Sequence, residues 1–251
     1  MAVRFSSEEF AKLKELLLIY EWGYRTLLTK LTIIQEDFEH FHDGNPIDYI
    51  RGRIKAPESI AEKLQRLGKE ITALSARDHI SDIAGIRIIC AYTRDIYHLV
   101  ELLKIIPDIN ISDEKDYMQH PKPSGYRSYH LMIEIPVFYS GKVENVAIEV
   151  QIRTEAMNFW ATLEHEAQYK YAGDIPEHLS NELVVCADEI AALDNRMFVI
   201  HENIIGRRTD TNPYKLPTLH CEDPAERSET KQNKPVRGRE LRRSYRGIRR
   251  G

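Results

Sequence analysis

Cysteine is scarce in this sequence, and the few residues present are not arranged for a shared site. Cys90, Cys186 and Cys221 lie far apart, and none belongs to a C-x-x-C pair. This spacing excludes a disulfide framework and a cysteine-based zinc site, and it is typical of a reducing, cytoplasmic setting. The sequence also lacks a signal peptide and any apolar run near the roughly 20 residues of a membrane span, so we expect no membrane partner.

Charge is distributed unevenly along the 251 residues, although the net charge is only −4. Residues 227–251 carry ten Lys and Arg against two Glu, whereas residues 1–226 carry 25 basic and 37 acidic side chains. Apolar periodicity stops beyond Gly206, while the preceding part is apolar enough to bury one sizeable core. We therefore predict a folded domain at 1–206 and a basic, disordered tail at 207–251.

The composition of the tail leaves three roles open. It can be an inert extension, a segment that docks on the protein's own acidic body, or an RNA-binding segment. Its arginines are interleaved with glycine and tyrosine, which suits contacts with flexible single-stranded RNA.

The most informative stretch runs from Asn145 to Tyr171. It begins as a strand, because Ile148, Val150 and Ile152 alternate with three polar residues, Glu149, Gln151 and Arg153. A carboxylate, an amide and a guanidinium in a row are the groups needed to hold a metal, a base edge and a phosphate. Thr154 can then cap a helix that ends near Gly173 and carries on one face Asn158, Thr162, His165 and Tyr169.

A cluster of cations precedes and enters a predicted helix at 58–67. Arg53 and Lys55 come just before this helix, and Ser59, Lys63 and Arg66 share one of its faces. Four cations and a hydroxyl at a helix N-terminus are a suitable site for a polyphosphate. An ordinary solvated basic face is the alternative.

The stretch from Asp82 to Ala91 predicts a buried strand that is nearly all apolar, with Cys90 as a small core residue. Arg87 is the exception, and its guanidinium needs an anionic or stacking partner because an unpaired buried charge is very costly. A salt bridge to a neighbouring carboxylate is the alternative. Asp82, at the start of the strand, is either a metal ligand or a turn residue.

A loop rich in proline and glycine lies between His120 and His130 and leads into a strand at 131–136. It offers Tyr126 as an aromatic ring for stacking, Lys122 as a donor, and His130 at the start of the strand.

Two apolar series with heptad spacing flank these elements, and they predict helices at 8–43 and 178–205 around a core at 44–173. Gly23 leaves one long N-terminal helix and two shorter ones both open. The two seams can pack on each other or pair between subunits.

Four separated stretches together resemble the small alarmone synthetases, the single-domain members of the RelA/SpoT-type family. They are G-R-I-K at 52–55 followed by Ser59, Lys63 and Arg66; D-I-A-G-I-R at 82–87; K-P-S-G-Y-R-S-Y-H at 122–130; and E-V-Q-I-R-T at 149–154 with A-M-N-F-W-A-T-L-E-H at 156–165. The likeness covers the part of the chain before the tail. Because the stretches occur in order with compatible spacing, they are far more specific together than any one alone.

The resemblance implies transfer of the β,γ-pyrophosphate of ATP to the ribose 3′-hydroxyl of GDP or GTP, which makes (p)ppGpp and releases AMP. It also implies Mg²⁺ as cofactor and often a homotetramer. The expected fold is an α/β (α+β) domain of nucleotidyltransferase-like type, with a mixed β-sheet flanked by helices and with the heptad helices at its two ends.

The same resemblance implies roles for the residues singled out above. Asp82 and Glu149 would be the catalytic pair that holds Mg²⁺. Glu149 is also the candidate general base; deprotonation by the metal itself is the alternative, because a metal-held carboxylate is a poor base. The ATP site would comprise Arg53 and Arg87 around adenine, and Lys55, Ser59, Lys63 and Arg66 on the phosphates. In the acceptor site, Tyr126 would stack on guanine, Asn158 would read its edge, and Lys122 and His130 would contact phosphates. Supporting roles behind these ligands fall to Gln151, Arg153 and His165.

Two other functions compete with this interpretation. One is transfer of pyrophosphate to the 3′ end of tRNA, as in toxin-like relatives, which the arginine-rich tail favours. The other is a catalytically idle RNA-binding protein, against which the intact Asp82 and Glu149 pair argues.

Overall fold

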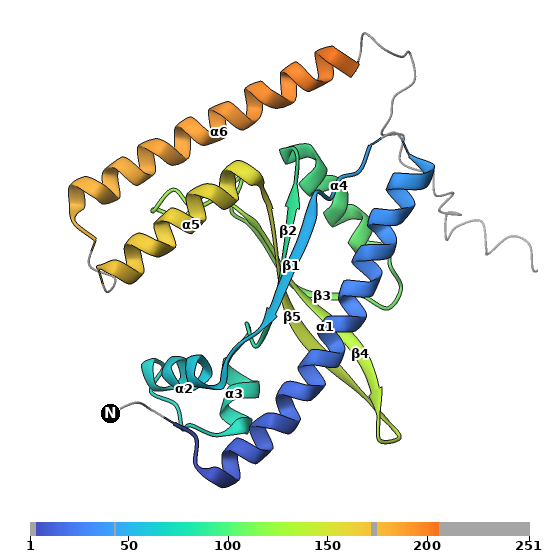
Figure 1. Ribbon diagram of the computed structural model, residues 1–251, viewed down its shortest axis with the longest axis vertical. Helices are drawn as coiled ribbons and strands as arrows, with labels where there is room; N and C mark the ends of the chain where they lie inside the picture. Colours follow the sequence, from blue (N-terminus) through green and yellow to red (C-terminus); the bar gives the residue numbers. More distant parts are fainter. Residues whose placement is uncertain (1–3, 43, 172–174, 206–251) are drawn as a thin grey trace, which may run out of the picture. The chain divides into compact units, whose positions relative to one another are not determined.

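The computed structural model describes residues 4–42, 44–171 and 175–205, and it contains a five-stranded mixed sheet (Figure 1). The strands are β1 (Tyr49–Ile54), β2 (Ala84–Cys90), β3 (Asn110–Asp116), β4 (Tyr129–Tyr139) and β5 (Lys142–Thr154). They are ordered β1-β2-β5-β4-β3, and only the β2–β5 pair is parallel. The helices are α1 (Ser7–Phe41), α2 (Pro57–Arg66), α3 (Ala73–His79), α4 (Thr93–Lys104), α5 (Glu155–Lys170) and α6 (Glu177–Ile205). The predicted fold class, a mixed sheet flanked by helices, is confirmed.

The two faces of the sheet differ in chemistry, as the alternation in β5 predicted. Ile148, Val150 and Ile152 are fully buried, and they join one apolar core with residues of α1 and α4. These helices lie along that face of the sheet (Figure 1). The opposite face carries Glu149 and Gln151, which leaves it available for a ligand.

Helix α1 runs without a break from Ser7 to Phe41, so Gly23 does not divide it. A Cβ atom at Gly23 would lie 2.9 Å from Val146, which shows that the glycine lets the helix approach β5 closely. The apolar seam of α1 packs on the sheet, whereas α6 packs on α5. The two heptad seams therefore serve different neighbours rather than each other.

Helix α5 begins as predicted, because the Thr154 hydroxyl accepts a hydrogen bond from the backbone N–H of Met157 at 3.2 Å. The predicted stop at Gly173 and the predicted basic tail at 207–251 lie outside the described residues. In the part of the chain that is described, none of the helices is both long enough and apolar enough to span a membrane.

Strand β1 and helix α3 were not predicted, and β4 is longer than the predicted strand at 131–136. In β1 the alternation of Tyr49, Arg51 and Arg53 with Ile50 and Ile54 is interrupted by Gly52, which weakens the strand pattern. A Cβ atom at Gly52 would lie 2.3 Å from the ring of Tyr24, so this position requires glycine. Strand β4 continues to Tyr139 and turns into β5 through Ser140 and Gly141, both at positive φ.

Candidate active site

The register of the sheet brings predicted site residues from three strands into one row on its polar face. Gln151 of β5 lies opposite Arg87 of β2 on one side and opposite His130 of β4 on the other. Because neighbouring strands are only about 4.8 Å apart, the three side chains form a continuous polar strip. Glu149 is two residues before Gln151 on the same face, opposite Gly85, whose lack of a side chain leaves space beside the carboxylate.

Asp82, in the turn before β2, is held between two lysines. Lys55 Nζ lies 2.5 Å from Asp82 Oδ2, and Lys63 Nζ lies 2.7 Å from Oδ1. Burial alone would raise the pKa of Asp82, but the hydrogen bonds from the two ammonium groups outweigh it and lower the pKa below its usual range. Asp82 is therefore an ionised carboxylate at neutral pH, and both lysines already converge on it.

Glu149 is also kept ionised, by different neighbours. His130 Nδ1 lies 3.6 Å from Glu149 Oε1, and Gln151 Nε2 donates a hydrogen bond to Oε2 at 3.2 Å. The contact with His130 is the main cause that lowers the pKa of Glu149, and it prevails over burial and over repulsion from Asp82.

The donor set fits a hard divalent cation. Mg²⁺ usually binds one or two carboxylates and completes its shell with water and substrate phosphates. Asp82 and Glu149 supply two such carboxylates, and the described residues include no group of three or more potential ligands that would form a closed metal cage. A site of this kind suits a metal that arrives with a nucleotide.

Arg87 and Asn158 belong to a second network, at the junction of β2 and α5. Arg87 Nη1 donates to Asn158 Oδ1 at 3.3 Å, and Asn158 Nδ2 donates to the hydroxyl of Tyr49 at 3.5 Å. Tyr49 in turn donates to Glu155 at 2.8 Å. Burial is the main cause that lowers the pKa of Arg87, and the nearby cation of Arg153 lowers it further. Tyr49 and Glu155 were missed, although the alternation around Gly52 places Tyr49 on the same face as Arg51 and Arg53.

The predicted acceptor loop is fixed in place by α6. Gly125 has a φ of +90°, which a side chain would strain, and a Cβ atom there would lie 2.7 Å from Ala187 of α6. The next residues are Tyr126 and Arg127, and Arg127 forms an ion pair with Asp188 of α6 at 3.0 Å. The contact between α6 and this loop was not predicted, because no local pattern in either segment indicates it.

Tyr126 is surrounded by polar and cationic groups. Lys122 Nζ lies 4.8 Å from the centre of its ring, and the Arg153 guanidinium lies 5.0 Å from it. The Tyr126 hydroxyl lies 2.7 Å from His130 Nε2. The structure thus brings together the residues predicted for the acceptor and those predicted to support Glu149.

Other predicted site residues lie on the surface without a described contact to this centre. Ser59 and Arg66 are exposed on α2, on the helix that supplies Lys63, and Arg53 is exposed on β1. His165 is exposed on α5, seven residues beyond Asn158. Ser59 and Arg66 share α2 with Lys63, and Arg53 is two residues before Lys55, whereas nothing described connects His165 to Glu149.

Residues 52–174 match the sequence family described as the region found in RelA / SpoT proteins. The chain is 46% identical over 191 residues to GTP pyrophosphokinase YwaC of Bacillus subtilis. The aligned region covers 76% of this chain and 91% of the relative. The chain therefore belongs to the RelA/SpoT family.

Solved structures agree with this assignment. Small alarmone synthetase 1 from Bacillus subtilis, bound to its product pppGpp, superimposes with a TM-score of 0.71 at 37% identity, over 77% of this chain and 98% of the other. The same enzyme bound to AMPCPP gives a TM-score of 0.67 at 34% identity, over 78% and 99% of the two chains.

Proposed function

We propose that this protein is a GTP pyrophosphokinase. It transfers the β,γ-pyrophosphate of ATP to the ribose 3′-hydroxyl of GDP or GTP, makes (p)ppGpp and releases AMP. The observation that carries this proposal is the position of Glu149 between two sets of side chains. On one side Asp82 is held by Lys55 and Lys63, and on the other His130 connects Glu149 to Tyr126.

The lysine-rich end is the proposed ATP site. Lys55, Ser59, Lys63 and Arg66 hold the phosphates, and Arg53 and Arg87 enclose the adenine. Support comes from the half-buried Lys55 and Lys63, whose charges converge on one carboxylate and can turn to phosphate oxygens when the nucleotide arrives. A similar enzyme, small alarmone synthetase 1 from Bacillus subtilis, has been solved with AMPCPP bound, which supports an adenine nucleotide as the ligand here.

The Tyr126 loop is the proposed acceptor site for GDP or GTP. Tyr126 stacks on guanine, Asn158 reads its edge, and Lys122 and His130 contact the phosphates. Support comes from the partly exposed ring of Tyr126 with Lys122 and Arg153 beside it, an arrangement that suits an electron-rich base and its phosphates.

The chemistry follows from these positions. The bond between the ribose O3′ and the β-phosphorus of ATP forms, the bond between that phosphorus and the α,β-bridging oxygen breaks, and AMP leaves with the bridging oxygen. Glu149 is the proposed acceptor of the 3′-hydroxyl proton, because it is ionised and free to accept; its lowered pKa makes it a weak base, so bound Mg²⁺ would assist the deprotonation. Asp82 and Glu149 would hold Mg²⁺, which when bound would neutralise charge on the phosphates. Lys55 and Lys63 add positive charge and orient the donor.

The acceptor decides between this function and its competitors. The protein is incubated with γ-labelled ATP and Mg²⁺, and GDP, GTP or tRNA is added in separate reactions. Label in a guanosine nucleotide supports the proposal, label at the 3′ end of tRNA supports the toxin-like alternative, and no transfer to any of them supports an idle RNA-binding protein.

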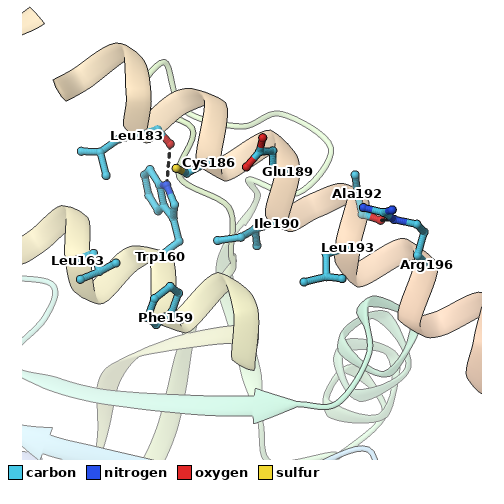
Figure 2. Close-up of a pocket in the computed structure, with 10 residues that line it drawn as sticks. All are labelled: Phe159, Trp160, Leu163, Leu183, Cys186, Glu189, Ile190, Ala192, Leu193 and Arg196. Atoms are coloured by element: carbon cyan, nitrogen blue, oxygen red, sulfur yellow. Dashed lines mark hydrogen bonds between the residues drawn. The ribbon is translucent and has the colours of Figure 1, made fainter. Parts of the chain in front are cut away.

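We also propose a homo-oligomer, in agreement with the tetramer expected from the family resemblance. Helix α6 exposes a band of apolar side chains that continues the seam of Leu183 and Ile190 toward its C-terminal end, where Leu193, Met197, Ile200 and Ile204 are each about half exposed. Beside it, Phe159 and Leu163 of α5 line a cavity of about 520 Å³ between the two helices (Figure 2). None of the predicted nucleotide-site residues lines this cavity, so a second subunit can cover it without blocking the site.

The basic segment at 227–251 is a proposed RNA contact, argued from composition alone. Its arginines can bind phosphates, and deleting the segment should weaken RNA affinity and flatten the dependence of binding on salt, because fewer counterions are released. Unchanged RNA binding after the deletion would contradict this proposal. Altered synthesis in the absence of RNA would point to docking on the catalytic body.

A further inference from the structure

Five site residues form a ring of side-chain contacts around the acceptor end of the site. Gln151 Nε2 donates to Glu149 Oε2 at 3.2 Å, and Arg153 Nη2 donates to Gln151 Oε1 at 2.8 Å. The same Nη2 donates to the Tyr126 hydroxyl at 2.5 Å, and that hydroxyl lies 2.7 Å from His130 Nε2. His130 Nδ1 closes the ring at 3.6 Å from Glu149 Oε1, which is longer than a hydrogen bond.

We infer that the Tyr126 hydroxyl and Arg153 are positioning residues for catalysis, which hold the Glu149 carboxylate through His130 on one oxygen and Gln151 on the other. The inference rests on the proposed function and gives Tyr126 two separable roles. Its ring face binds the acceptor base, whereas its hydroxyl belongs to the ring that orients Glu149.

Counting protons around the ring assigns the tautomer of His130. Arginine can only donate, so the Tyr126 hydroxyl accepts from Arg153 and has one proton of its own left to donate. We assign that proton to the bond with His130 Nε2, at 2.7 Å, which makes Nε2 the acceptor. The proton of the neutral imidazole then resides on Nδ1 and faces Glu149 Oε1. Contacts of this kind are often long in a free enzyme and tighten when substrates bind.

The surroundings of Arg153 argue against a purely structural arginine. Its side chain is almost completely buried, with the residue 4% exposed, yet no described carboxylate forms an ion pair with it. Its hydrogen-bond partners are the neutral oxygens of Tyr126, Gln151 and, at 3.4 Å, Ser128. A buried cation without a counterion costs free energy. Arg153 orders the Tyr126 hydroxyl and the Gln151 amide, the two groups that position Glu149. This positioning role gives a reason for a buried cation at this place.

The two roles of Tyr126 are separated by changing it to phenylalanine. Tyr126→Phe keeps the ring for stacking and removes the hydroxyl. We expect kcat to fall roughly tenfold or more, since a hydrogen bond in a charged network is lost, while the KM for GDP changes less than about twofold. Tyr139→Phe is the matched control, because the Tyr139 hydroxyl also donates to a carboxylate, Glu144, but at the distant hairpin. It should leave kcat unchanged.

A second measurement follows His130 directly and requires no turnover. In protein labelled with ¹⁵N-histidine, the ring nitrogens of His130 are assigned by comparison with His130→Gln. We expect the Nδ1–H tautomer in the free wild-type enzyme and a shift toward the Nε2–H tautomer in Tyr126→Phe, which has lost the donor to Nε2. Tyr139→Phe should give the wild-type spectrum.

A lower kcat with an unchanged KM for GDP, together with a changed tautomer, supports the inference. A wild-type kcat in Tyr126→Phe or a rise in the KM for GDP like that of Tyr126→Ala would overturn it. So would a neutral His130 that carries its proton on Nε2 in the wild type, or one whose tautomer is the same in Tyr126→Phe. If the wild-type protein transferred nothing to GDP or GTP, the proposed function would fail, whereas the tautomer measurement would still test the ring.

Discussion

Arg87 of β2 donates a hydrogen bond to Asn158 of α5 at 3.3 Å. The proposed function places Arg87 beside adenine and Asn158 beside guanine, so this contact joins the two nucleotide sites. In the free protein each residue occupies the other's polar group. Binding of either nucleotide therefore has to rearrange or use this contact.

The contact can be strengthened with Asn158→Asp, which converts the neutral acceptor into a carboxylate. An ion pair with the half-buried Arg87 should hold the guanidinium more tightly than the amide does. We expect the KM for ATP to rise several-fold in Asn158→Asp, whereas Asn158→Ala, which releases Arg87, should affect mainly the KM for the acceptor. Equal KM values for ATP in the wild type and both variants would show that Arg87 does not leave Asn158 to bind the adenine of ATP.

The metal and base roles of Glu149 are tested by Glu149→Gln. The amide has nearly the same shape but can neither neutralise a cation nor accept the proton, so turnover should fall by roughly three orders of magnitude or more. The thermal transition should stay near that of the wild type. Glu144→Gln, on the same strand at the hairpin end, is the control and should retain activity. Near-wild-type turnover in Glu149→Gln would show that Glu149 is neither the metal ligand nor the general base.

The ring of Tyr126 is tested by its removal. Base stacking on an aromatic side chain contributes roughly 1–3 kcal/mol, so Tyr126→Ala should raise the KM for GDP or GTP by about 5- to 150-fold. The KM for ATP should change much less. Steady-state kinetics with each nucleotide varied in turn decide the point, and equal effects on both substrates would make Tyr126 a structural residue instead.

Asp95, at the third residue of α4, predicts a pH dependence of stability. It is 1% exposed, and burial raises its pKa from 3.8 to about 6 in spite of the attraction of Arg94. Between these values the folded state binds more protons than the unfolded state, so the free energy of unfolding falls as pH rises from about 4 to about 6, by roughly 3 kcal/mol at most.

Urea unfolding at several pH values checks this dependence. Asp95→Asn cannot titrate, so its stability relative to the wild type should increase as pH rises through the same interval. Asp78→Asn, at an exposed position on α3, serves as the control and should follow the wild-type curve. Parallel curves for the wild type and Asp95→Asn would show that Asp95 titrates normally.

The exposed band on α6 predicts which surface assembles. Sedimentation of the wild type at micromolar concentration should show an oligomer, and the paired change Leu193→Glu and Met197→Glu should dissociate it by placing charges on the apolar face. Ile33→Glu, at an exposed apolar position on α1, tests the other heptad helix. A monomeric wild type would contradict assembly, and dissociation by Ile33→Glu alone would move the interface to α1.

Local patterns in the sequence predicted much of the fold and many of the site residues. The alternation around Glu149 placed the polar face of β5 correctly, and Thr154 marked the start of α5, because both signals depend on neighbouring residues only. The break at Gly52 hid β1, since its cause is a close contact with Tyr24 far away in the sequence.

The contacts between site residues could not be predicted from the sequence, because they also depend on residues far apart in the chain. The convergence of Lys55 and Lys63 on Asp82 depends on how α2 packs beside the start of β2. The ring through Tyr126 and Arg153 depends on the register of β4 against β5. Spacing along the chain carries neither relationship, although it identified every member of both.

Transfer of pyrophosphate differs from transfer of a single phosphoryl group in its adenine product, which is AMP rather than ADP. The protein is incubated with ATP, Mg²⁺ and GDP, and the nucleotides are separated and quantified over time. We expect AMP in equal amount to a guanosine nucleotide that carries two added phosphates on its 3′-oxygen, with both products absent in Glu149→Gln. Formation of ADP together with GTP, or AMP without a modified guanosine nucleotide, would contradict it.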